Sequence, residues 1–372
     1  PKGCQWVHWQ QESMPNCNDV HEIDLRVAMP LRKGGPKLPN LGWGSDQTED
    51  SATVQERWNA QKYGYVGSGL WRSVWKLDPR GELNHFGKGL SESGPPPAVL
   101  KVMKQEHPFD ARNIDRHRRD ALTMERMTSS KFVANIYGYC GNTVLTEYVG
   151  HTLDKVIYKN NKDEAVPEPD FDADPLLTRE TPAGRVKLAL DVFRGLSAMH
   201  TISGGPIIHA DIQAKQFLVD SRAGVVKIND FNRCRFLPHN NITGTPCPVR
   251  IPSAPGANRS PEEYEGDPIT EKADVFSAGH VLYGILTGKK PWENEKATRI
   301  KQLVKAGHKP DISNGFRKPG TTDAMLANLV EKAYQVNPTK RMSASDILLE
   351  LEKIEGSTET TVRSKDRSNP SL

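Results

Sequence analysis

Two aspartates in short polar segments constrain this chain more than any other feature. Asp211 lies in the segment HADIQAKQ at 209–216, and Asp230 follows 19 positions later in KINDFN at 227–232. Short apolar runs border both segments, which is typical of chain that enters a core. Phosphoryl transfer needs such a pair of carboxylates. One positions and deprotonates the attacking hydroxyl, while the other holds a divalent metal against the phosphates.

Length and composition bound the class of protein. The 372 residues suffice for one large or two modest domains, and 36% hydrophobic residues with a mean hydropathy of −0.62 predict sizeable polar tails or insertions. The 50 basic and 46 acidic residues are interspersed and give a net charge of +4, so we expect no nucleic-acid partner. No apolar run approaches the ~20 residues that span a bilayer, so we expect no transmembrane segment in this chain.

The five cysteines leave the compartment open. They form no CxxC pair and no metal-ligand spacing, which favours a reduced, cytoplasmic protein, but the odd count does not exclude one or two disulfides. Two triplets, Asn241-Ile242-Thr243 and Asn258-Arg259-Ser260, have the form of N-glycosylation acceptors, although such triplets also arise by chance. The chain begins with proline rather than methionine, so a signal peptide or anchor ahead of it, and with it a secretory lumen, stays open.

The pattern along the chain predicts three regions. Residues 1–60 are expected to be an irregular extension, and residues 355–372 a disordered polar tail. Between them, strand patterns dominate 61–147 and helix patterns dominate 148–354. This order predicts an α+β chain with a small lobe of antiparallel sheet and one helix, and a larger, mainly helical lobe.

A glycine turn and a strand lysine suggest a nucleotide site in the first lobe. Gly67 and Gly69 belong to GSGLWRSV at 67–74, between two predicted strands, where glycine lets backbone amides approach phosphate oxygens. Lys101 lies in the apolar strand AVLKV at 98–102, and a lysine in such surroundings needs an anionic partner. An ordinary hairpin turn and an outward-facing lysine are the alternatives.

Taken in order, these segments resemble the eukaryotic protein kinases over about residues 63–354. The resemblance rests on the glycine turn, Lys101, the catalytic-loop segment 209–216 and the metal-binding segment 230–232. It implies a two-lobed protein-kinase-like fold. It also implies an enzyme that uses ATP and Mg to transfer the γ-phosphoryl group to a Ser/Thr or Tyr hydroxyl of a protein substrate. It implies no particular oligomeric state.

The resemblance also implies roles for the polar residues of the second lobe. Asp211 would be the catalytic base, and Lys215 would neutralise the γ-phosphate. Asp230 and Gln216 would be the metal ligands. Outside this group, Glu262 is expected to pair with Arg341, and Asp274 to accept hydrogen bonds from the backbone of the catalytic loop.

Nucleotide contacts are expected mainly from the first lobe. Asp120 would be the helix partner of Lys101, and the backbone of Glu147 and Val149 would hydrogen-bond the adenine. The residues implied to bind the nucleotide are Gly67, Gly69, Val74, Lys101, Asp120, Glu147 and Val149.

Five positions depart from the kinase pattern. Arg72 replaces the third glycine of the loop, and Asp120 stands where a glutamate is usual. Ala210 replaces the arginine that pairs with a phosphorylated activation loop in many kinases, so we expect activity without such phosphorylation. Gln216 replaces asparagine and moves its amide oxygen about 1.5 Å outward. Asn232 replaces glycine and is expected to adopt a positive φ.

These departures keep other functions open. Arg72, Asp120 and Gln216 favour a pseudokinase scaffold, which binds partners, with or without nucleotide, but does not turn over. A kinase-fold enzyme with a sugar or another small molecule as acceptor also stays open, because a fold does not fix its acceptor. Lys215 and Gln213 lean toward a tyrosine acceptor, but the segment before Ser260 lacks a tyrosine-kinase pattern, so dual specificity is open as well.

Overall fold

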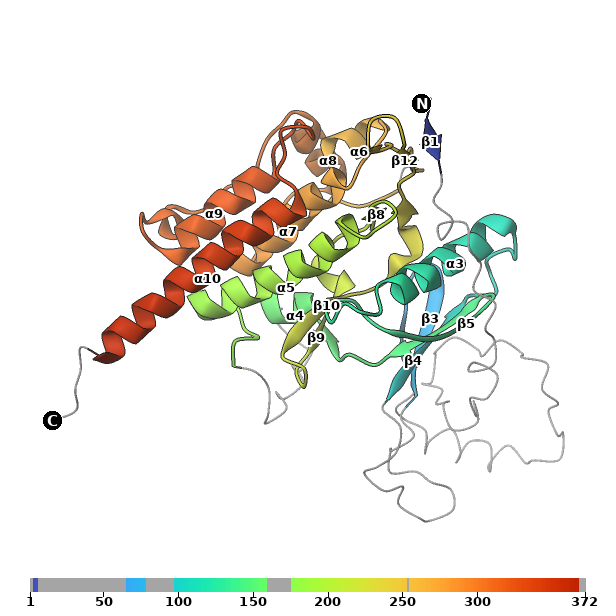
Figure 1. Cartoon of the computed structure of the whole chain (residues 1–372), viewed down its shortest axis with the longest axis horizontal. Helices are drawn as coiled ribbons and strands as arrows, with labels where there is room; N and C mark the ends of the chain where they lie inside the picture. The colour runs from blue at the N-terminus through green and yellow to red at the C-terminus, as the bar shows by residue number, and fades with distance from the viewer. Residues whose placement is uncertain (1–2, 6–64, 78–96, 159–174, 253, 368–372) are drawn as a thin grey trace, which may run out of the picture. The chain divides into compact units, whose positions relative to one another are not determined.

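The computed structural model describes the residues 3–5, 65–77, 97–158, 175–252 and 254–367 (Figure 1). The chain divides into two compact units. We call residues 13–128 and 134–148 the sheet unit, and residues 1–12, 129–133 and 149–372 the helical unit. The chain therefore leaves the sheet unit after Tyr148. Apart from residues 3–5, the predicted extension at 1–60 lies outside the described residues.

The sheet unit contains a five-stranded antiparallel sheet. Its strands, in spatial order, are β2 (Tyr65–Ser68), β3 (Arg72–Leu77), β4 (Ala98–Met103), β6 (Thr143–Glu147) and β5 (Ile136–Cys140). In the register of β3 and β4, Arg72 lies opposite Met103 and Val74 lies opposite Lys101. Because side chains alternate along a strand, Arg72, Val74 and Lys101 share one face of the sheet. The small antiparallel sheet that the sequence predicts is confirmed.

One helix, α3 (Ala111–Arg126), belongs to the sheet unit and packs against β5 and β6. It begins after Asp110, whose Oδ1 accepts a hydrogen bond from the backbone N–H of Asn113 at 2.8 Å. This bond satisfies one of the free amides of the first turn. The buried face carries Ala121, Leu122 and Met124, all without solvent exposure. The same face also carries the carboxylate of Asp120 into the interior.

The helical unit is built on four long helices. They are α5 (Pro182–His200), α7 (Lys272–Thr287), α9 (Thr322–Ala333) and α10 (Ala344–Arg367). Helix α5 packs against α7 and α10, and α7 packs against α9, as Figure 1 shows. The α+β class and the two-part protein-kinase architecture are thus confirmed. Residues 355–367, which the sequence predicts as disordered tail, instead continue α10.

Short elements of the helical unit carry its polar segments. The short helices are α4 (Leu153–Ile157), η3 (Ala214–Gln216), η4 (Phe231–Arg233), α6 (Pro261–Glu265), α8 (Ala297–Lys305) and η5 (Asn314–Arg317). Three small antiparallel sheets accompany them: β7 (His151–Thr152) with β9 (Phe217–Asp220) and β10 (Val225–Ile228); β8 (Ile207–Ile208) with β11 (Arg235–Phe236); and β1 (Cys4–Gln5) with β12 (His239–Asn240) and β13 (Thr245–Pro246). The apolar runs around Asp211 and Asp230 form β8, β9 and β10.

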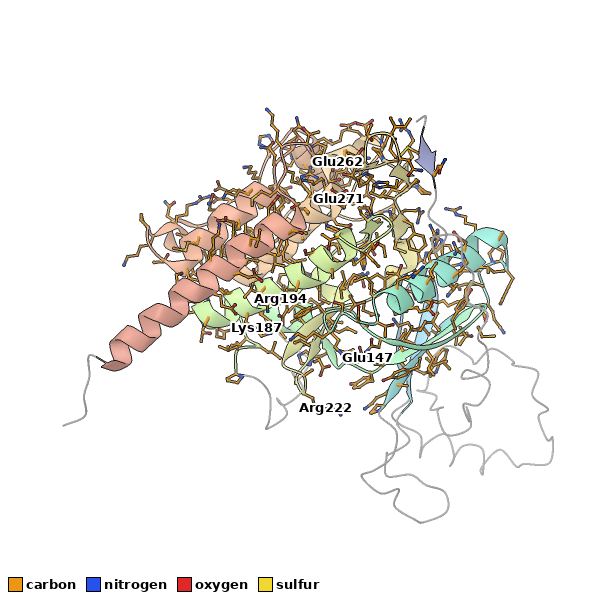
Figure 2. All side chains as sticks on the ribbon, viewed as in Figure 1. Glu147, Lys187, Arg194, Arg222, Glu262 and Glu271 are labelled. Carbon is orange, nitrogen blue, oxygen red and sulfur yellow. A yellow bond between two sulfur atoms is a disulfide. The ribbon has the colours of Figure 1, made fainter. Side chains whose placement is uncertain are left out.

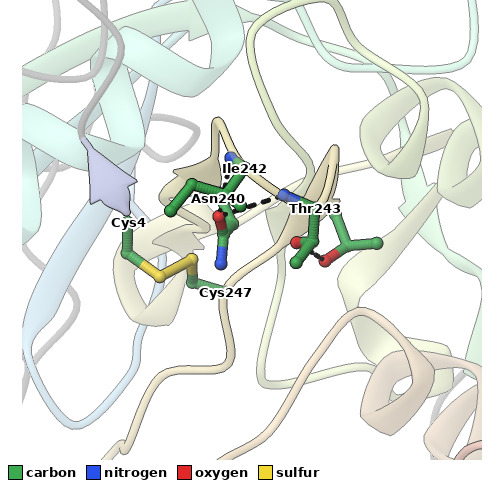
Figure 3. The surroundings of a disulfide bond; sticks show 6 residues. Cys4, Asn240, Ile242, Thr243 and Cys247 are labelled. Atoms are coloured by element: carbon green, nitrogen blue, oxygen red, sulfur yellow. Dashed lines mark hydrogen bonds between the residues drawn. A yellow bond between two sulfur atoms is a disulfide. The ribbon is translucent and has the colours of Figure 1, made fainter. Parts of the chain in front are cut away.

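A disulfide joins the start of the chain to the segment after β13. Cys4 on β1 bonds Cys247, 243 residues later, and Figure 3 shows the bond beside the β12–β13 turn. Cys140 is also disulfide-bonded, whereas Cys234 is buried and forms no disulfide. The reduced state that the cysteine pattern favours is therefore wrong for Cys4, Cys140 and Cys247. Local spacing gave no sign of the Cys4–Cys247 bond, because the fold brings together cysteines that are remote in sequence.

Within the described ranges, no helix is both long and apolar enough to cross a membrane.

Candidate active site

The residues that the sequence singles out fall into both units. Asp211, Lys215, Gln216, Asp230 and Val149 belong to the helical unit, and Gly67, Gly69, Val74, Lys101, Asp120 and Glu147 belong to the sheet unit. Each group is described within its own unit.

The catalytic-loop segment 209–216 is anchored on helix α7. The buried carboxylate of Asp274 accepts hydrogen bonds from the backbone N–H groups of His209, at 2.6 Å, and Ala210, at 2.9 Å. His200 of α5 places its Nε2 3.2 Å from the same carboxylate. Ala210 has a φ of 60°, which strains a residue with a Cβ, so these bonds hold the loop in a conformation it would otherwise disfavour. The predicted role of Asp274 is confirmed.

The segment that carries Asp230 is bonded directly to the catalytic-loop segment. Asn229, the residue before Asp230, donates its backbone N–H to the carbonyl of Gln216 at 2.9 Å. The carbonyl of Asn229 accepts a bond from Nε2 of His209 at 3.0 Å. One residue is thus tied to both ends of segment 209–216. The fold therefore brings the backbones that carry Asp211 and Asp230 side by side.

The carboxylate of Asp211 is held at both oxygens. Oδ1 accepts a bond from Nη2 of Arg259 at 3.2 Å, and Oδ2 accepts one from Nε2 of Gln216 at 3.1 Å. The side chain keeps 19% of its surface exposed. A carboxylate that is fixed in orientation yet reachable from solvent has the two properties that a general base requires.

Arg259 links this carboxylate to two further charges. Its Nη1 donates to the carbonyl of Ala210 at 2.9 Å and lies 3.1 Å from Oε1 of Glu263. Arg233 contacts the same Glu263 oxygen at 3.2 Å. Burial raises the pKa of Glu263 to about 7, and the charges of Arg259 and Arg233 only partly offset that effect. No role of Arg259 at Asp211 could be predicted from the sequence, because the signal there is only its position before Ser260.

In the segment 230–232, the strained backbone belongs to Asp230. This residue has φ 66° and ψ 66°, whereas Asn232 lies within the short helix η4. The expectation that Asn232 adopts a positive φ is therefore wrong. Asn232 acts through its side chain instead, because Nδ2 donates to Oδ1 of Asp230 at 2.6 Å. An amide at this position can orient the Asp230 carboxylate, which glycine could not do.

Lys215 and Gln216 are the other residues of the helical unit for which the sequence predicts a charged ligand. Lys215, on η3, is exposed, and Gln216 is buried at 6% exposure. Because Gln216 donates from Nε2 to Asp211, its Oε1 is left as the oxygen that a cation can use. No cluster of three or more His, Cys, Asp or Glu side chains suited to a metal occurs among the described residues. Magnesium in phosphoryl-transfer sites needs only one or two protein oxygens, because the phosphates supply others. Asp230 and Gln216 fit that donor set.

In the sheet unit, the buried carboxylate of Asp120 pairs with Arg72. Nη1 of Arg72 donates to Oδ2 of Asp120, and the two residues are 5% and 0% exposed. Burial raises the pKa of Asp120, but the positive charges of Arg72 and the buried Lys101 outweigh it and hold that pKa below the ordinary value. The residue that replaces the third loop glycine is thus an ion-pair partner, a role that the local sequence pattern does not indicate.

The glycine turn is open on the side where side chains would project. A Cβ added to Gly67 or Gly69 would meet no atom of the described residues within 4 Å. The backbone N–H of Gly69 donates to the carbonyl of Arg72 at 2.9 Å, which closes the hairpin turn. Packing among the described residues does not demand glycine here, and glycine lets a ligand approach the backbone closely, as a phosphate-binding loop requires. Val74, opposite Lys101, is half-buried.

Glu147, labelled in Figure 2, and Val149 are the neighbours of Tyr148, the last residue of the sheet unit. The backbone N–H of Glu147 donates to the carbonyl of Asn135 at 3.0 Å, and its Oε1 accepts from the N–H of Asn135 at 2.8 Å. A nucleotide could therefore use the carbonyl of Glu147 but not its N–H. The N–H of Val149 has no hydrogen-bond partner among the described residues, so this donor is available to a ligand.

A buried ion pair anchors the region after the catalytic segments. Glu262 of α6, labelled in Figure 2, accepts two hydrogen bonds from Arg341, at 2.7 and 3.1 Å. Arg341 is 1% exposed and also donates to the carbonyl of Lys272 at 2.6 Å. This two-bond geometry and the added backbone contact offset the cost of burying both charges. The predicted pair is confirmed.

Comparison with known proteins agrees with this arrangement. The protein kinase domain matches residues 89–350, which is 262 of the 372 residues. The chain is 32% identical over 177 residues to the serine/threonine-protein kinase VIK of Arabidopsis thaliana, covering 47% of this chain and 38% of that protein. It is 33% identical over 171 residues to the serine/threonine-protein kinase STY46 of the same plant, covering 45% and 27%. The dual specificity protein kinase splA of Dictyostelium discoideum is 28% identical over 192 residues, covering 48% and 8%.

This chain belongs to the protein kinase family. Membership implies, for the family in general, the use of ATP and magnesium and a protein substrate. The chain spans about a third of the length of the first two relatives, so the comparison concerns the kinase domain that they share.

Proposed function

We propose that this chain is an active protein kinase that transfers the γ-phosphoryl group of ATP to a Ser/Thr or Tyr hydroxyl of a protein. The observation that carries this proposal is the double hydrogen bond of Asn229 to Gln216 and His209. It ties the segment that ends in Asp230 to the segment that contains Asp211. Two carboxylates held on adjoining, strained segments match the needs of in-line phosphoryl transfer.

Within this proposal, each residue has one task. Asp211, oriented by Arg259 and Gln216, accepts the proton of the attacking hydroxyl. Lys215, exposed and positively charged, balances charge on the γ-phosphate. Asp230 and Oε1 of Gln216 hold magnesium, which supplies charge neutralisation for the phosphates when it is bound.

The nucleotide would bind through the residues named in the sequence. The turn at Gly67 and Gly69 lets a phosphate approach its backbone closely, although the N–H of Gly69 is already bonded to the carbonyl of Arg72, and Lys101 offers a positive charge held on the sheet. The carbonyl of Glu147 and the N–H of Val149 are the backbone groups suited to adenine. Val74 and Asp120 would support Lys101 in this role. Val74 lies opposite Lys101 on the neighbouring strand, and Asp120 provides a negative charge that interacts with it.

The alternative is a pseudokinase scaffold, and one observation favours it. Asp120 pairs with Arg72, so its charge is shared between an arginine and Lys101. If that pairing drew Asp120 away from Lys101, the lysine would be poorly positioned for nucleotide phosphates. The intact Asp211 and Asp230 favour the active enzyme over this alternative.

One assay separates the two functions. The purified chain is incubated with labelled ATP and magnesium or manganese, and any phosphorylated product is hydrolysed for phosphoamino-acid analysis. Incorporation into the chain itself or into a general protein acceptor supports the kinase and reports its hydroxyl preference. Thermal-shift measurements with ATP, with and without magnesium, accompany this assay. Stabilisation by ATP without phosphate incorporation, in the presence of either magnesium or manganese, would favour the scaffold.

A further inference from the structure

The β12–β13 turn carries one of the two N-glycosylation triplets. Asn241, Ile242 and Thr243 are all exposed, and Ile242 shows 78% of its surface. Oδ1 of Asn240 accepts hydrogen bonds from the backbone of Ile242 at 2.9 Å and of Thr243 at 3.2 Å, which Figure 3 shows as dashed lines. The triplet therefore forms a projecting surface turn, which is the setting that glycosylated asparagines occupy.

The second triplet is built into the interior and provides an internal contrast. Ser260 has no exposure, and its Oγ accepts a bond from the N–H of Glu263 at the start of α6. Arg259 is 4% exposed and contacts Asp211. Nδ2 of Asn258 donates to the carbonyl of Ile212. A glycan on Asn258 would have no room beside these contacts, so the structure distinguishes the two triplets.

The disulfide points independently to the same compartment as the exposed triplet. Disulfides form and persist in oxidising compartments, and the endoplasmic reticulum that forms them also contains the N-glycosylation machinery. Cys4 bonds Cys247 one residue beyond β13, and Cys140 is disulfide-bonded as well. The disulfide and the triplet therefore lie on one hairpin. Disulfide formation and N-glycosylation take place in the same compartment, so each feature supports the other.

We propose that Asn241 carries an N-linked oligosaccharide and that the chain folds in a disulfide-forming compartment. The donor is a lipid-linked oligosaccharyl diphosphate. Nδ2 of Asn241 bonds the anomeric carbon of the first sugar while the bond from that carbon to the diphosphate oxygen breaks. The lipid diphosphate leaves, and one amide proton passes to a base of the transferase.

The folded turn accommodates this product. After transfer, Nδ2 retains one hydrogen, and within the described part of the chain Nδ2 makes a single hydrogen bond, to Oε1 of Gln5 at 2.9 Å. The remaining amide hydrogen thus suffices for the hydrogen bond to Gln5. Asn241 also borders a hollow of about 400 Å³, lined in part by His200, Gly204 and His239, which leaves space on that side. A glycan here would cover the exposed Ile242.

The test expresses the full chain in a eukaryotic cell behind a cleavable secretion leader. We expect one glycan, removed by an amidase specific for N-linked glycans, with Asn241 converted to aspartate and identified by mass spectrometry. Asn241→Gln and Thr243→Val should each abolish the glycan, whereas Thr243→Ser keeps the triplet and should retain it. Peptides from unreduced protein should contain the Cys4–Cys247 bond in the original chain and in all three variants. That result would show that a missing glycan does not reflect misfolding.

The same two peptides are then measured in protein captured from its natural source with an antibody. A glycan at Asn241 together with the Cys4–Cys247 bond supports the proposal. Disulfide-bonded protein with unmodified Asn241, a glycan that persists in Asn241→Gln, or natural protein with free Cys4 and Cys247 would each overturn it. None of these readouts depends on kinase activity.

Discussion

Arg72 and Asp120 form a buried ion pair between strand β3 and helix α3. Asp120 has no solvent exposure, and the charge of Arg72 is the largest of those that keep its pKa below the ordinary value despite burial. Arg72 stands where the kinase pattern has the third glycine of the loop, and Asp120 stands where that pattern has a glutamate on the helix. The glycine turn of this chain is thus tied at one end to α3, within the sheet unit.

Removing Arg72 should destabilise the protein strongly. In Arg72→Met the carboxylate of Asp120 stays buried without its bonded arginine, and we expect the free energy of unfolding to fall by about 3–5 kcal/mol. Denaturant unfolding followed by fluorescence measures this. The control is the cycle with Asp120→Asn: the double variant should be more stable than the sum of the two single losses predicts. Strict additivity would contradict the pairing.

Asp211→Asn should remove turnover while leaving nucleotide binding in place. Asparagine keeps the shape, and its Oδ1 can still accept the hydrogen bond from Arg259, but it cannot accept the proton of the substrate hydroxyl. We expect the rate of phosphate transfer to fall by about 10²–10⁴-fold, with the thermal shift produced by ATP and magnesium unchanged. Single-turnover incorporation of labelled phosphate is the measurement. Retained activity would show that Asp211 is not the base.

Gln216 allows a matched pair of variants to test the metal site. Gln216→Asn keeps an amide oxygen, so we expect transfer equal to or above that of the original chain. Gln216→Leu removes both the oxygen for magnesium and the hydrogen bond to Asp211. It should lose most of the magnesium-dependent stabilisation by ATP, measured by thermal shift over a magnesium titration. Equal behaviour of the two variants would mean that Gln216 does not contact the metal.

Activity should rise as pH increases through about 7. The pKa of Glu263 is raised from 4.5 to about 7, so the side chain is neutral below that pH and ionised above it. When Glu263 is neutral, Arg259 loses its ion pair with Glu263 and therefore holds Asp211 less firmly in the orientation that the reaction needs. The pH profile of kcat/KM measures this, and Glu263→Gln should lose the step near pH 7. An unchanged profile would refute the link.

The same ionisation should affect stability with a definite sign. Between pH 4.5 and 7 the folded chain keeps a proton on Glu263 that the unfolded chain has released. The contribution of Glu263 to stability is therefore complete below pH 4.5 and is lost as pH rises through 7. Denaturant unfolding over this pH range measures the effect. As pH rises, the free energy of unfolding should fall less in Glu263→Gln than in the original chain.

Breaking the Cys4–Cys247 bond should lower stability, because the bond closes a loop over 243 residues. We expect Cys4→Ser and Cys247→Ser each to lower the free energy of unfolding by about 2–5 kcal/mol, with a somewhat larger loss at the more buried Cys247. The double variant should lose little more than Cys247→Ser alone, since either substitution already opens the loop. Summed losses in the double variant would show that the bond does not form in solution.

Much of this protein could be predicted from local sequence alone. The alternation in β3 and β4, the helix after Asp110 and the order of Lys101, Asp211 and Asp230 all reflect interactions between near neighbours, which a linear pattern records. The contacts of Asp274 and of Glu262 with Arg341 could also be predicted, because the resemblance supplied partners for residues far apart. These features determined the α+β class and the family.

Tertiary structure alone decided the partners of charged and reactive groups. Arg72 reaches Asp120 across 48 positions, Arg259 reaches Asp211 across 48, and Cys4 reaches Cys247 across 243. No local periodicity encodes such pairs, because each depends on where packing brings two distant segments together. The backbone strain at Asp230 rather than Asn232 has the same origin: hydrogen bonds from remote residues, and not the intrinsic preference of one residue, fix that turn.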